Sequence, residues 1–466
     1  SKGGIYKADV MHTSNLGHFL NMRAKKILVK YVPKGIGNFN PKFKTDHGYW
    51  TILRASMLVP FYNTKNVKAA DAPKVSPVAR RIAEVRKQGT GVVAVVSAMG
   101  DTTDDLLELA HSVSDQPHPR ELDLLLSTGE LVSCTLLTMA LADLGQEAVS
   151  LTGSQAGIRT DTSHGRARIY SVDTARIRKE LQDGRTVVVA GFQGITEGDD
   201  ITTLGRGGSD TTAVALAAAL EADRCEVYTD VDGIFTADPK IVPEARKLSE
   251  ISYDEMLELA NYGAKMHPRS IELGAVYNVP IYVASSFNDT PGTLIHGDAD
   301  KGDMEHRIKA TGIAITRNVA KITVRGVPDR PGVAATLFEP LAQSGISVDT
   351  IVQNTSEDRT TDISFTISGD DLKAALAKVE ELTSEIGFST LISEAGLAAV
   401  SVVGSGMQHT PGYASRMFRV LADGSVNIDM ITTSEIRISC IIKEDQAEDA
   451  VRLLHRGFQL DEEDPG

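Results

Sequence analysis

Short apolar segments alternate with amphipathic ones along the first two thirds of the chain. The spacing of apolar positions predicts helices at 77–88, 102–113, 130–144 and 211–222. Continuous apolar runs predict buried strands at 92–96, 186–190 and 225–229. Strands that are apolar throughout are typical of a parallel sheet with helices on both faces. We therefore expect an α/β fold with a mainly parallel central sheet and ligands bound beyond the carboxyl ends of its strands.

Beyond about Lys301 the pattern changes, and it then repeats at an offset of 80 residues. Pro331-Gly332 corresponds to Pro411-Gly412, and Leu341-Ala342 corresponds to Leu421-Ala422. Each copy is predicted to run strand, Pro-Gly turn, helix, strand and second helix. Two copies are too few for a solenoid, which needs at least about three. The repeat therefore predicts a pair of small α/β domains packed on one another.

Length and composition indicate a soluble protein of several domains. A chain of 466 residues exceeds one ordinary hydrophobic core. No continuous apolar run approaches the roughly 20 residues that cross a bilayer, and the first residues lack the layout of a secretory signal. Cys134, Cys225 and Cys440 are scattered and odd in number, which argues against a disulfide framework or a cysteine metal site. We expect a cytoplasmic protein with no membrane partner and no protein-held metal cluster.

Charge is distributed very unevenly along the chain. Residues 1–70 carry twelve Lys or Arg against Asp9 and Asp46, a balance of +10, so the net charge of −14 leaves −24 for the remainder. The same segment holds Trp50, the chain's one tryptophan. Interleaved basic and aromatic residues are a pattern that binds nucleic acid. A solvated extension is the commoner explanation, and a transit peptide is another, so we do not expect a nucleic-acid partner.

The six residues from Gly205 to Asp210 combine three glycines with a cation, a hydroxyl and a carboxylate, directly before a predicted helix. Glycines let the backbone approach a ligand closely, and a helix N-terminus offers free N–H groups and a partial positive charge. This combination suits a phosphate or a carboxylate. The alternative is a tight turn capped by Ser209 or Asp210.

Three further clusters follow predicted strands or begin predicted helices. Ser97 to Gly100 follows the strand at 92–96 and is either a phosphate-binding loop or an ordinary turn, and Thr102, Thr103 and Asp104 then suit N-capping. Glu130 is placed at a predicted helix start, where it orients an ammonium group or simply complements the helix dipole. Hydroxyls and carboxylates in the segment 228–240 follow another strand and suit a nucleotide or its Mg²⁺.

Taken together, the segments 97–106, 127–130, 203–210 and 227–239 closely resemble aspartokinase, a member of the amino acid kinase family. The similarity runs from roughly Asn66 to Phe458, and the repeat resembles that enzyme's tandem ACT domains. The resemblance implies an amino-acid-kinase-like sandwich followed by two ferredoxin-like ACT domains. The implied limits are an atypical basic segment at 1–65, a kinase domain at 66–300, and ACT domains at 315–395 and 396–460.

The resemblance also implies a reaction, in which ATP with Mg²⁺ phosphorylates the side-chain carboxylate of L-aspartate to give 4-phospho-L-aspartate and ADP. This is the first step of lysine, threonine and methionine biosynthesis. The implied catalytic residues are Asp210 and Arg206. The implied substrate-binding residues are Thr102, Thr103, Asp104, Glu130, Arg206, Gly207, Gly208 and Ser209. The implied nucleotide-binding residues are Ser97, Gly100, Ser209, Thr229, Asp230, Phe235, Thr236, Ala237, Asp238, Pro239, Lys240 and Lys265.

By the same resemblance, the ACT pair binds threonine, lysine or both as feedback effectors and joins the chain into a homo-oligomer or hetero-oligomer. Without the family, the same residues read as a turn and the polar edge of a strand. The implied effector residues are Asp329, Pro331, Gly332, Val333, Ala334, Gln353, Asn354, Thr361 and Asp362.

One family feature is missing from the chain. Aspartokinases begin with a strand ending in Lys-Phe/Tyr-Gly-Gly-Thr-Ser, whereas here Tyr31 is followed by Val32-Pro33 and Lys65 has no glycine pair beside it. Single groups that stabilise transferring charge are commonly worth about 10²-fold or more in rate. We therefore expect crippled activity unless Lys30 or Lys65 substitutes. The alternative function is a catalytically impaired amino-acid-sensing or regulatory subunit.

Overall fold

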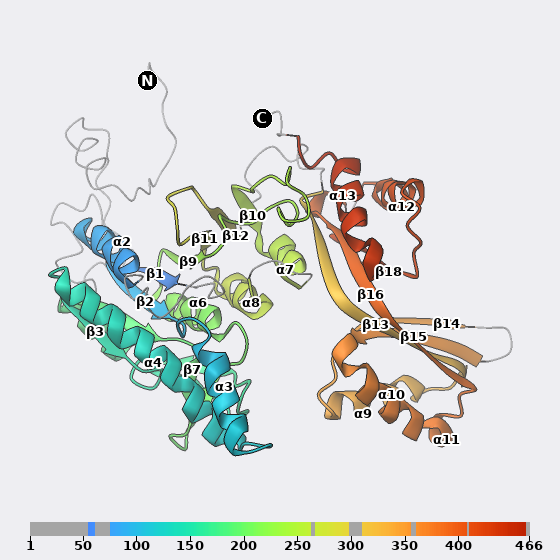
Figure 1. Ribbon diagram of the computed structural model, residues 1–466, viewed down its shortest axis with the longest axis horizontal. Helices are drawn as coiled ribbons and strands as arrows, with labels where there is room; N and C mark the ends of the chain where they lie inside the picture. The colour runs from blue at the N-terminus through green and yellow to red at the C-terminus, as the bar shows by residue number, and fades with distance from the viewer. Residues whose placement is uncertain are drawn as a thin grey trace, which may run out of the picture. The chain divides into compact units, whose positions relative to one another are not determined.

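The computed structural model describes residues 55–60, 75–261, 266–297, 310–355, 360–407 and 410–462. Contacts within the chain divide it into two compact units, residues 1–232 with 269–297, and residues 233–268 with 298–466. Figure 1 shows the helices and strands of both units. Lys265 and most of the basic N-terminal segment, including Lys30 and Lys65, lie outside the described residues.

A mainly parallel sheet forms the centre of the first unit, which confirms the predicted fold class. Within this unit its strands are ordered β12-β11-β9-β1-β2-β6-β3, and only β12 pairs antiparallel to its neighbour there. The strands are β1 Ala55–Pro60, β2 Gly91–Val96, β3 Ala148–Leu151, β6 Thr186–Ala190, β9 Arg224–Thr229, β11 Ile281–Ser285 and β12 Thr293–His296. Every residue of β2 and β6 is buried, as their apolar sequences predict.

Helices cover both faces of this sheet (Figure 1). On one face α2, Val75–Lys87, and α4, Pro119–Asp143, pack their apolar residues against alternate residues of β2 and β6. On the other face α6, Gly208–Leu220, contacts β1, β2 and β9. Nearly all of α6 is buried, and its sequence is apolar or small on every side, as a fully buried helix requires.

A smaller four-stranded sheet and further helices also belong to the described part of the first unit. The strand order is β5-β4-β7-β8. Its strands are β4 Ile158–Thr160, β5 Ile169–Val172, β7 Gln193–Ile195 and β8 Ile201–Thr203. The helices are α3 Thr102–Val113, α5 Ala175–Gln182 and α8 Pro268–Tyr277. Because β8 ends at Thr203, the chain runs directly from β8 into the glycine loop, Gly205 to Asp210, which leads into α6.

Helix α4 corrects one prediction, because it begins at Pro119 rather than near residue 130. Gly129 lies inside the helix, where a Cβ would come within 3.0 Å of the Ala98 Cβ. The glycine therefore permits α4 to approach the segment after β2. By length and composition alone α4 would suffice to cross a membrane, yet it carries buried, hydrogen-bonded Asp123 and Glu130, as a core helix does.

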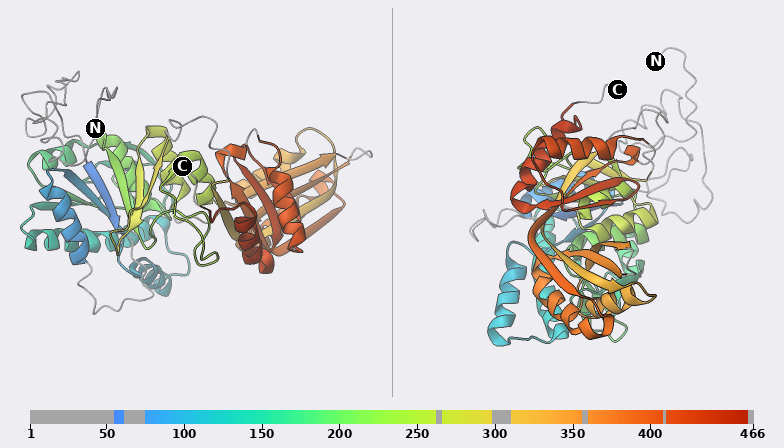
Figure 2. Two further views of the ribbon diagram at one scale, coloured as in Figure 1. Left: turned by 90° about the horizontal axis from the view of Figure 1, so that it is seen from above. Right: turned by 90° about the vertical axis from the view of Figure 1, so that its right-hand side faces the viewer.

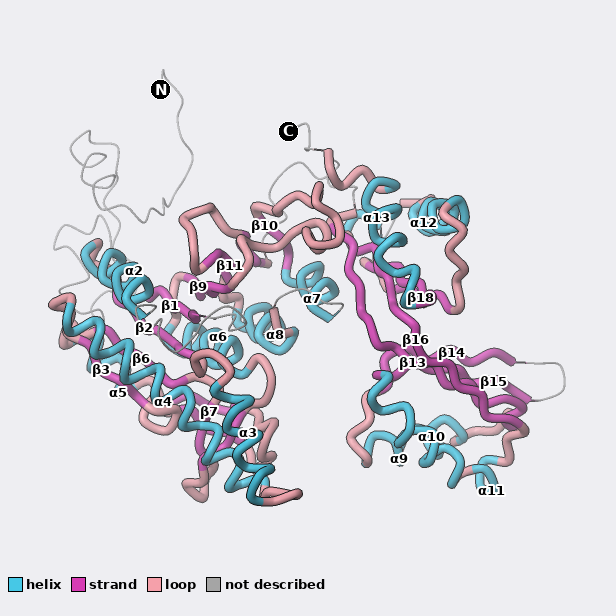
Figure 3. Tube along the Cα trace, in the orientation of Figure 1, coloured by secondary structure: helices cyan, strands magenta, loops and turns pink. Residues whose placement is uncertain are grey.

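The second unit is built on one antiparallel sheet ordered β14-β15-β13-β16-β18-β17 (Figure 3). Its strands are β13 Gly312–Pro328, β14 Val348–Thr355, β15 Thr360–Ser368, β16 Thr390–Val403, β17 Met430–Thr433 and β18 Arg437–Lys443. Its helices are α9 Val333–Gln343, α10 Leu372–Glu381, α11 Thr383–Ile386, α12 Tyr413–Asp423 and α13 Ala447–Gly457. Strand β10, Glu250–Ser252, and helix α7, Tyr253–Asn261, also belong to this unit.

Each copy of the repeat contains one strand more than the sequence pattern predicted, β15 in the first and β18 in the second. The long strands β13 and β16 join the copies, because residues 312–316 pair with 399–403 and residues 319–325 pair with 390–397. The two halves of each long strand thus serve different copies, which share one sheet (Figure 2, orange to red). The limit expected between residues 395 and 396 falls inside β16.

Residues 233–250 pack into the second unit, although they fall within the range expected for the kinase domain. Ala237, Ile241 and Val242 are buried in the same core as Val400 and Leu454 of the second repeat. The sequence pattern carried no sign of this packing, because it depends on residues about 200 positions further along the chain.

Candidate active site

The loops that follow β2 and β6 lie side by side at the carboxyl edge of the parallel sheet. Val96 is in register with Ala190, and the Gly191 amide donates to the Val96 carbonyl at 2.9 Å. The N-terminus of α6 lies against the same point, since a Cβ on Gly191 would come within 2.9 Å of the Ser209 Oγ. The fold therefore brings the segment that begins at Ser97 and the start of α6 together beside Gly191.

The glycine loop turns sharply into α6. Gly205 and Gly207 have φ angles of 79° and 70°, which favour glycine. Gly207 is the N-cap residue and receives no side-chain cap, which disfavours a turn capped by Ser209 or Asp210. Gly208 already belongs to the helix, where a Cβ would lie 2.8 Å from Phe192. Arg206, between the two left-handed glycines, is exposed.

Ser209 and Asp210 occupy the first turn of α6, and both are almost fully buried. The Ser209 Oγ and the Asp210 Oδ1 have no hydrogen-bond partner among the described residues. Burial raises the pKa of Asp210 to about 7. Unpartnered buried oxygens cost free energy unless a ligand satisfies them, so this turn has the properties of a binding site.

Glu130 projects from the middle of α4 and is only 2% exposed. Its Oε1 accepts a hydrogen bond from the Ala98 amide at 3.0 Å, while its Oε2 has no partner in the described part of the chain. Burial raises the pKa of Glu130 to about 7, although the Ala98 hydrogen bond opposes the shift. Because Glu130 lies mid-helix, the interpretation as a residue complementing a helix start is wrong. A half-satisfied buried carboxylate suits a cationic ligand instead.

Thr102, Thr103 and Asp104 form the first turn of α3 as predicted, but none of them is the N-cap residue, which is Asp101. The Thr102 hydroxyl donates to the Met99 carbonyl. Its Cγ2 would lie 3.4 Å from a Cβ on Gly129. Thr102 therefore lies against α4, one residue from Glu130.

The predicted nucleotide residues divide between the two units. Thr229 ends β9 in the first unit, and its hydroxyl donates to the Asp230 Oδ1 at 3.2 Å. In the second unit, the Thr236 hydroxyl lies 2.9 Å from the His455 Nε2, and Ala237 is buried. The roles expected for Phe235 to Lys240 stay predictions, and Lys265 lies outside the described residues.

The predicted effector residues gather at one end of the first repeat. Asp329 to Ala334 lead from β13 into α9, where Gly332 is the left-handed N-cap residue. Asn354 of β14 pairs with Asp362 of β15, and Gln353 precedes it. The Asp362 Oδ1 accepts from the Gly326 amide at 3.0 Å, and the Thr361 hydroxyl donates to the Asn354 carbonyl.

Sequence reasoning missed Gln193, which is 2% exposed and joins three segments of the site. Its Nε2 donates to the Ser127 carbonyl at 3.0 Å, and its Oε1 accepts from the Gly153 amide at 3.3 Å. The neighbouring Phe192 has a φ of 66°, a left-handed conformation that a bulky residue seldom adopts. The sequence does carry a pattern that could have marked Gln193, because residues 191–194 are Gly-Phe-Gln-Gly and directly follow an apolar strand.

Among the described residues, no group of three or more His, Cys, Asp or Glu side chains is placed to hold a metal ion. Mg²⁺ in enzymes that use nucleotides is commonly bound by one or two carboxylates together with substrate phosphates. The unpartnered Asp210 Oδ1 fits such a shared site.

Family profiles match the chain in the order of one kinase domain followed by two ACT domains. The profile of the amino acid kinase family matches residues 65–285. Two ACT domain profiles match residues 322–383 and 400–458, which correspond to the two copies of the repeat.

Individual relatives cover most of the chain. An aspartokinase of Mycolicibacterium smegmatis is 50% identical over 413 residues, 88% of this chain and 97% of the relative. An aspartate kinase of Pseudomonas putida is 50% identical over 389 residues, 83% of this chain and 94% of the relative. A crystal structure of E. coli aspartokinase III in complex with aspartate and ADP matches with a TM-score of 0.70 at 26% identity, covering 87% of this chain and all of that one. The same enzyme in complex with lysine and aspartate matches with a TM-score of 0.66 at 25% identity, covering 87% and 99%. The chain belongs to the aspartokinase family.

Proposed function

We propose that this chain transfers the γ-phosphoryl group of ATP to the side-chain carboxylate of L-aspartate, giving 4-phospho-L-aspartate and ADP, in the cytoplasm. The observation that carries the proposal is Glu130, a buried carboxylate with one oxygen held by the Ala98 amide and the other unpartnered among the described residues. This group lies in the same unit as a helix N-terminus with unpartnered Ser209 and Asp210 oxygens. An α-ammonium group satisfies Glu130, whereas phosphate oxygens with an associated cation satisfy Ser209 and Asp210.

Arg206 and Glu130 select the amino acid in this proposal. The guanidinium of Arg206 is exposed and carries the planar fork that binds a carboxylate through two hydrogen bonds, so it holds the α-carboxylate. Glu130 Oε2 accepts from the α-ammonium, which favours the charged form of this buried carboxylate. Thr102, Thr103 and Asp104 line the adjoining turn of α3.

The glycine loop and the turn after β2 hold the phosphates. The first N–H groups of α6 have no partner within the helix and point to its N-terminal end, where the helix dipole favours anions. Ser209, with Ser97 and Gly100 across the sheet edge, contacts phosphate oxygens, while Thr229 and Asp230 contact the nucleotide. The aspartate side-chain oxygen forms a bond to the γ-phosphorus as the bond to the bridging oxygen of ADP breaks. The protein's contribution is positioning and charge neutralisation.

Mg²⁺ supplies positive charge to the transferring phosphoryl group when it is bound. Asp210 is placed to interact with the cationic groups around that phosphoryl, because it lies in the first turn of α6 and is nearly fully buried.

A steady-state assay of ADP release tests this assignment. We expect Arg206→Ala to raise the KM for L-aspartate by about 10²-fold, because a charge-assisted bidentate pair is lost, with little change in the KM for ATP. Arg176→Ala removes an equally exposed arginine from α5 and should leave both constants unchanged. Equal KM values for L-aspartate in Arg206→Ala and the unmodified chain would refute the role of Arg206.

The proposal includes feedback control in the pathway to lysine, threonine and methionine. The effector residues gather at one end of the first repeat, where α9 begins, as a ligand site between ACT domains requires. Threonine, lysine or both bind there and favour an inactive arrangement, which requires unequal affinity for the two states. Oligomers form through the ACT domains.

A second function, a catalytically impaired amino-acid-sensing subunit, is favoured by one observation. The chain lacks the Lys-Phe/Tyr-Gly-Gly-Thr-Ser motif with which aspartokinases begin. We infer a turnover below that of relatives that carry the motif. Isothermal titration with threonine and lysine, alongside the ADP assay, separates the two functions, because a sensor binds effector without turning over.

A further inference from the structure

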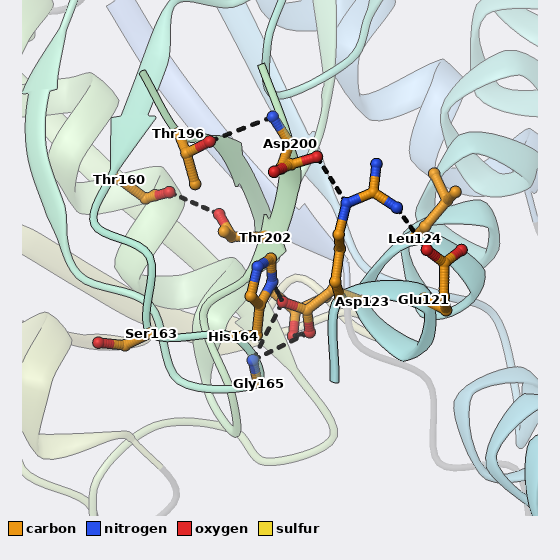
Figure 4. Close-up of polar contacts among 12 residues, drawn as sticks. Glu121, Asp123, Leu124, Thr160, Ser163, His164, Gly165, Thr196, Asp200 and Thr202 are labelled. Carbon is orange, nitrogen blue, oxygen red and sulfur yellow. Dashed lines mark hydrogen bonds and ion pairs between the residues drawn. The ribbon is translucent and has the colours of Figure 1, made fainter. Parts of the chain in front are cut away.

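Asp123, near the start of α4, is a second buried carboxylate on the helix that carries Glu130, and it is only 1% exposed. It accepts hydrogen bonds from two distant segments, and Figure 4 shows those from His164 and Gly165. The His164 Nδ1 lies 2.8 Å from its Oδ2, the Gly165 amide donates at 3.0 Å, and the Thr203 hydroxyl donates to its Oδ1 at 2.5 Å. Unlike Glu130, this carboxylate is saturated with donors from the protein.

The two segments that Asp123 binds are themselves packed backbone to backbone. The Ala167 amide donates to the Thr203 carbonyl at 2.9 Å. A Cβ on Gly205 would come within 3.0 Å of the Gly165 carbonyl oxygen. Asp123 therefore joins α4 to the end of β8, just before the glycine loop, through Thr203, and to the segment packed against Gly205 through Gly165.

Arg269 of α8 holds the same loop from another side. Its guanidinium donates to the Leu204 carbonyl at 3.1 Å and to the Ala167 carbonyl at 2.8 Å. Arg206 is two residues beyond Leu204, so its backbone is fixed by these contacts while its side chain stays exposed. Charged groups thus hold the residues that precede the glycine loop, while the Arg206 side chain within the loop is exposed.

Asp123 and Glu130 are seven residues apart, which places them on the same face of α4 about 10 Å apart along its axis. Asp123 is bound to residues that precede or pack against the loop that carries Arg206, and Glu130 is half-satisfied. We propose that Asp123 is a positioning residue that sets the distance between Arg206 and Glu130, and so fits the site to the α-carboxylate and α-ammonium groups of L-aspartate. This inference rests on the proposed function, in which those two groups hold the α-carboxylate and α-ammonium.

The test uses two neighbouring threonines of β8. Thr203→Val removes one donor to Asp123 without changing the side-chain shape, and leaves that carboxylate with the His164 and Gly165 donors. Thr202→Val makes the same change at the adjacent residue, which is equally buried and bonds Thr160 at 2.5 Å instead (Figure 4). Thr203→Ser keeps the hydroxyl and serves as the conservative rescue.

Binding of L-aspartate, L-glutamate and ATP is measured by isothermal titration on the full chain, with a thermal melt of every variant. We expect Thr203→Val to weaken L-aspartate binding roughly tenfold, because a hydrogen bond to a charged group is lost and the loop shifts. The preference for L-aspartate over L-glutamate should stay unchanged, because both carry the same α-carboxylate and α-ammonium groups. ATP binding should stay within about twofold, and Thr203→Ser and Thr202→Val should bind as the unmodified chain does.

Unchanged affinity for L-aspartate in Thr203→Val would overturn the inference while leaving the proposed function standing. An equal loss of L-aspartate and ATP binding, or the same loss in Thr202→Val, would show a general structural role and would also overturn it. Failure of the unmodified chain to bind L-aspartate would refute the proposed function itself, and this inference with it.

Discussion

Glu130→Gln should make the first unit more stable while it removes the binding of L-aspartate. The substitution keeps an oxygen that accepts from the Ala98 amide and removes only the charge. Burial raises the pKa of Glu130 from its ordinary 4.5 to about 7. In the folded protein the carboxyl group therefore keeps its proton to higher pH than in the unfolded chain.

The sign of the effect follows from linkage. Because the folded pKa is raised, the free energy of unfolding falls as the pH rises from 4.5 to 7, and the loss is complete above 7. At about 1.4 kcal/mol for each pKa unit, the shift corresponds to a loss of about 3 kcal/mol. The neutral glutamine does not suffer this loss. The variant should therefore match the unmodified chain in acid and exceed its stability above pH 7.

Thermal melting at pH 5.5 and pH 8, without ligands, measures the difference. One kcal/mol shifts the melting temperature of a domain of this size by roughly 2 °C, so we expect the variant to gain up to about 6 °C at pH 8 and less at pH 5.5. Glu121→Gln, on an exposed residue of the same helix, is the control and should show no such dependence on pH. A melting temperature for Glu130→Gln that stays at or below that of the unmodified chain at pH 8 would refute the reasoning.

Gly191→Ala places a Cβ 2.9 Å from both the Ser209 Oγ and the Val95 Cγ1, so thermal melting should show a loss of about 1–3 kcal/mol in the free energy of unfolding, and the KM for ATP should rise. Gly198→Ala is the control, because the nearest atom to its Cβ lies at 3.7 Å. Equal stability and equal KM values in the two variants would contradict the packing argument. Glu255→Gln weakens the hydrogen bonds that Glu255 accepts from the Thr311 hydroxyl at 2.7 Å and the Ser405 amide at 2.8 Å; burial raises the pKa of Glu255, but such hydrogen bonds outweigh it and hold the pKa below its ordinary value. The free energy of unfolding of the second unit should therefore fall by about 1–3 kcal/mol at pH 7, and by progressively less as the pH falls through the folded pKa. A loss of stability that is the same at all pH values would contradict this prediction. Asp362→Asn disturbs the hydrogen bond that Asp362 accepts from the Gly326 amide at 3.0 Å, so the affinity for threonine or lysine, measured by titration calorimetry, should fall. Asp370→Asn changes another exposed aspartate and is the control. Unchanged affinity for both amino acids in Asp362→Asn would exclude Asp362 from the effector site.

Local patterns in the sequence were sufficient for the central strands of the parallel sheet and for the glycine loop. The apolar runs at 92–96 and 186–190 can only be buried on both faces, and the structure shows them at the centre of the parallel sheet. The glycines at 205 and 207 have the left-handed φ angles for which glycine is needed.

Features that depend on distant packing could not be predicted in the same way. Gly129 looks like a helix break in sequence, but its role is set by contact with Ala98, 31 residues earlier. Asp123 is joined to Thr203 across 80 residues, and no local pattern marks that hydrogen bond. The 80-residue repeat is visible in the sequence. The pairing of β13 with β16, however, depends on the register between two long strands, and the repeat does not specify that register.

Trapping of the acyl phosphate with hydroxylamine is the most direct test of the proposed reaction. We expect the unmodified chain to form aspartate hydroxamate only when both ATP and L-aspartate are present, at a turnover below that of the M. smegmatis aspartokinase assayed in parallel. Asp210→Asn should form none above background, because it changes the buried carboxylate in the first turn of α6. The same low background for the unmodified chain and Asp210→Asn would contradict the assignment of an aspartate kinase site.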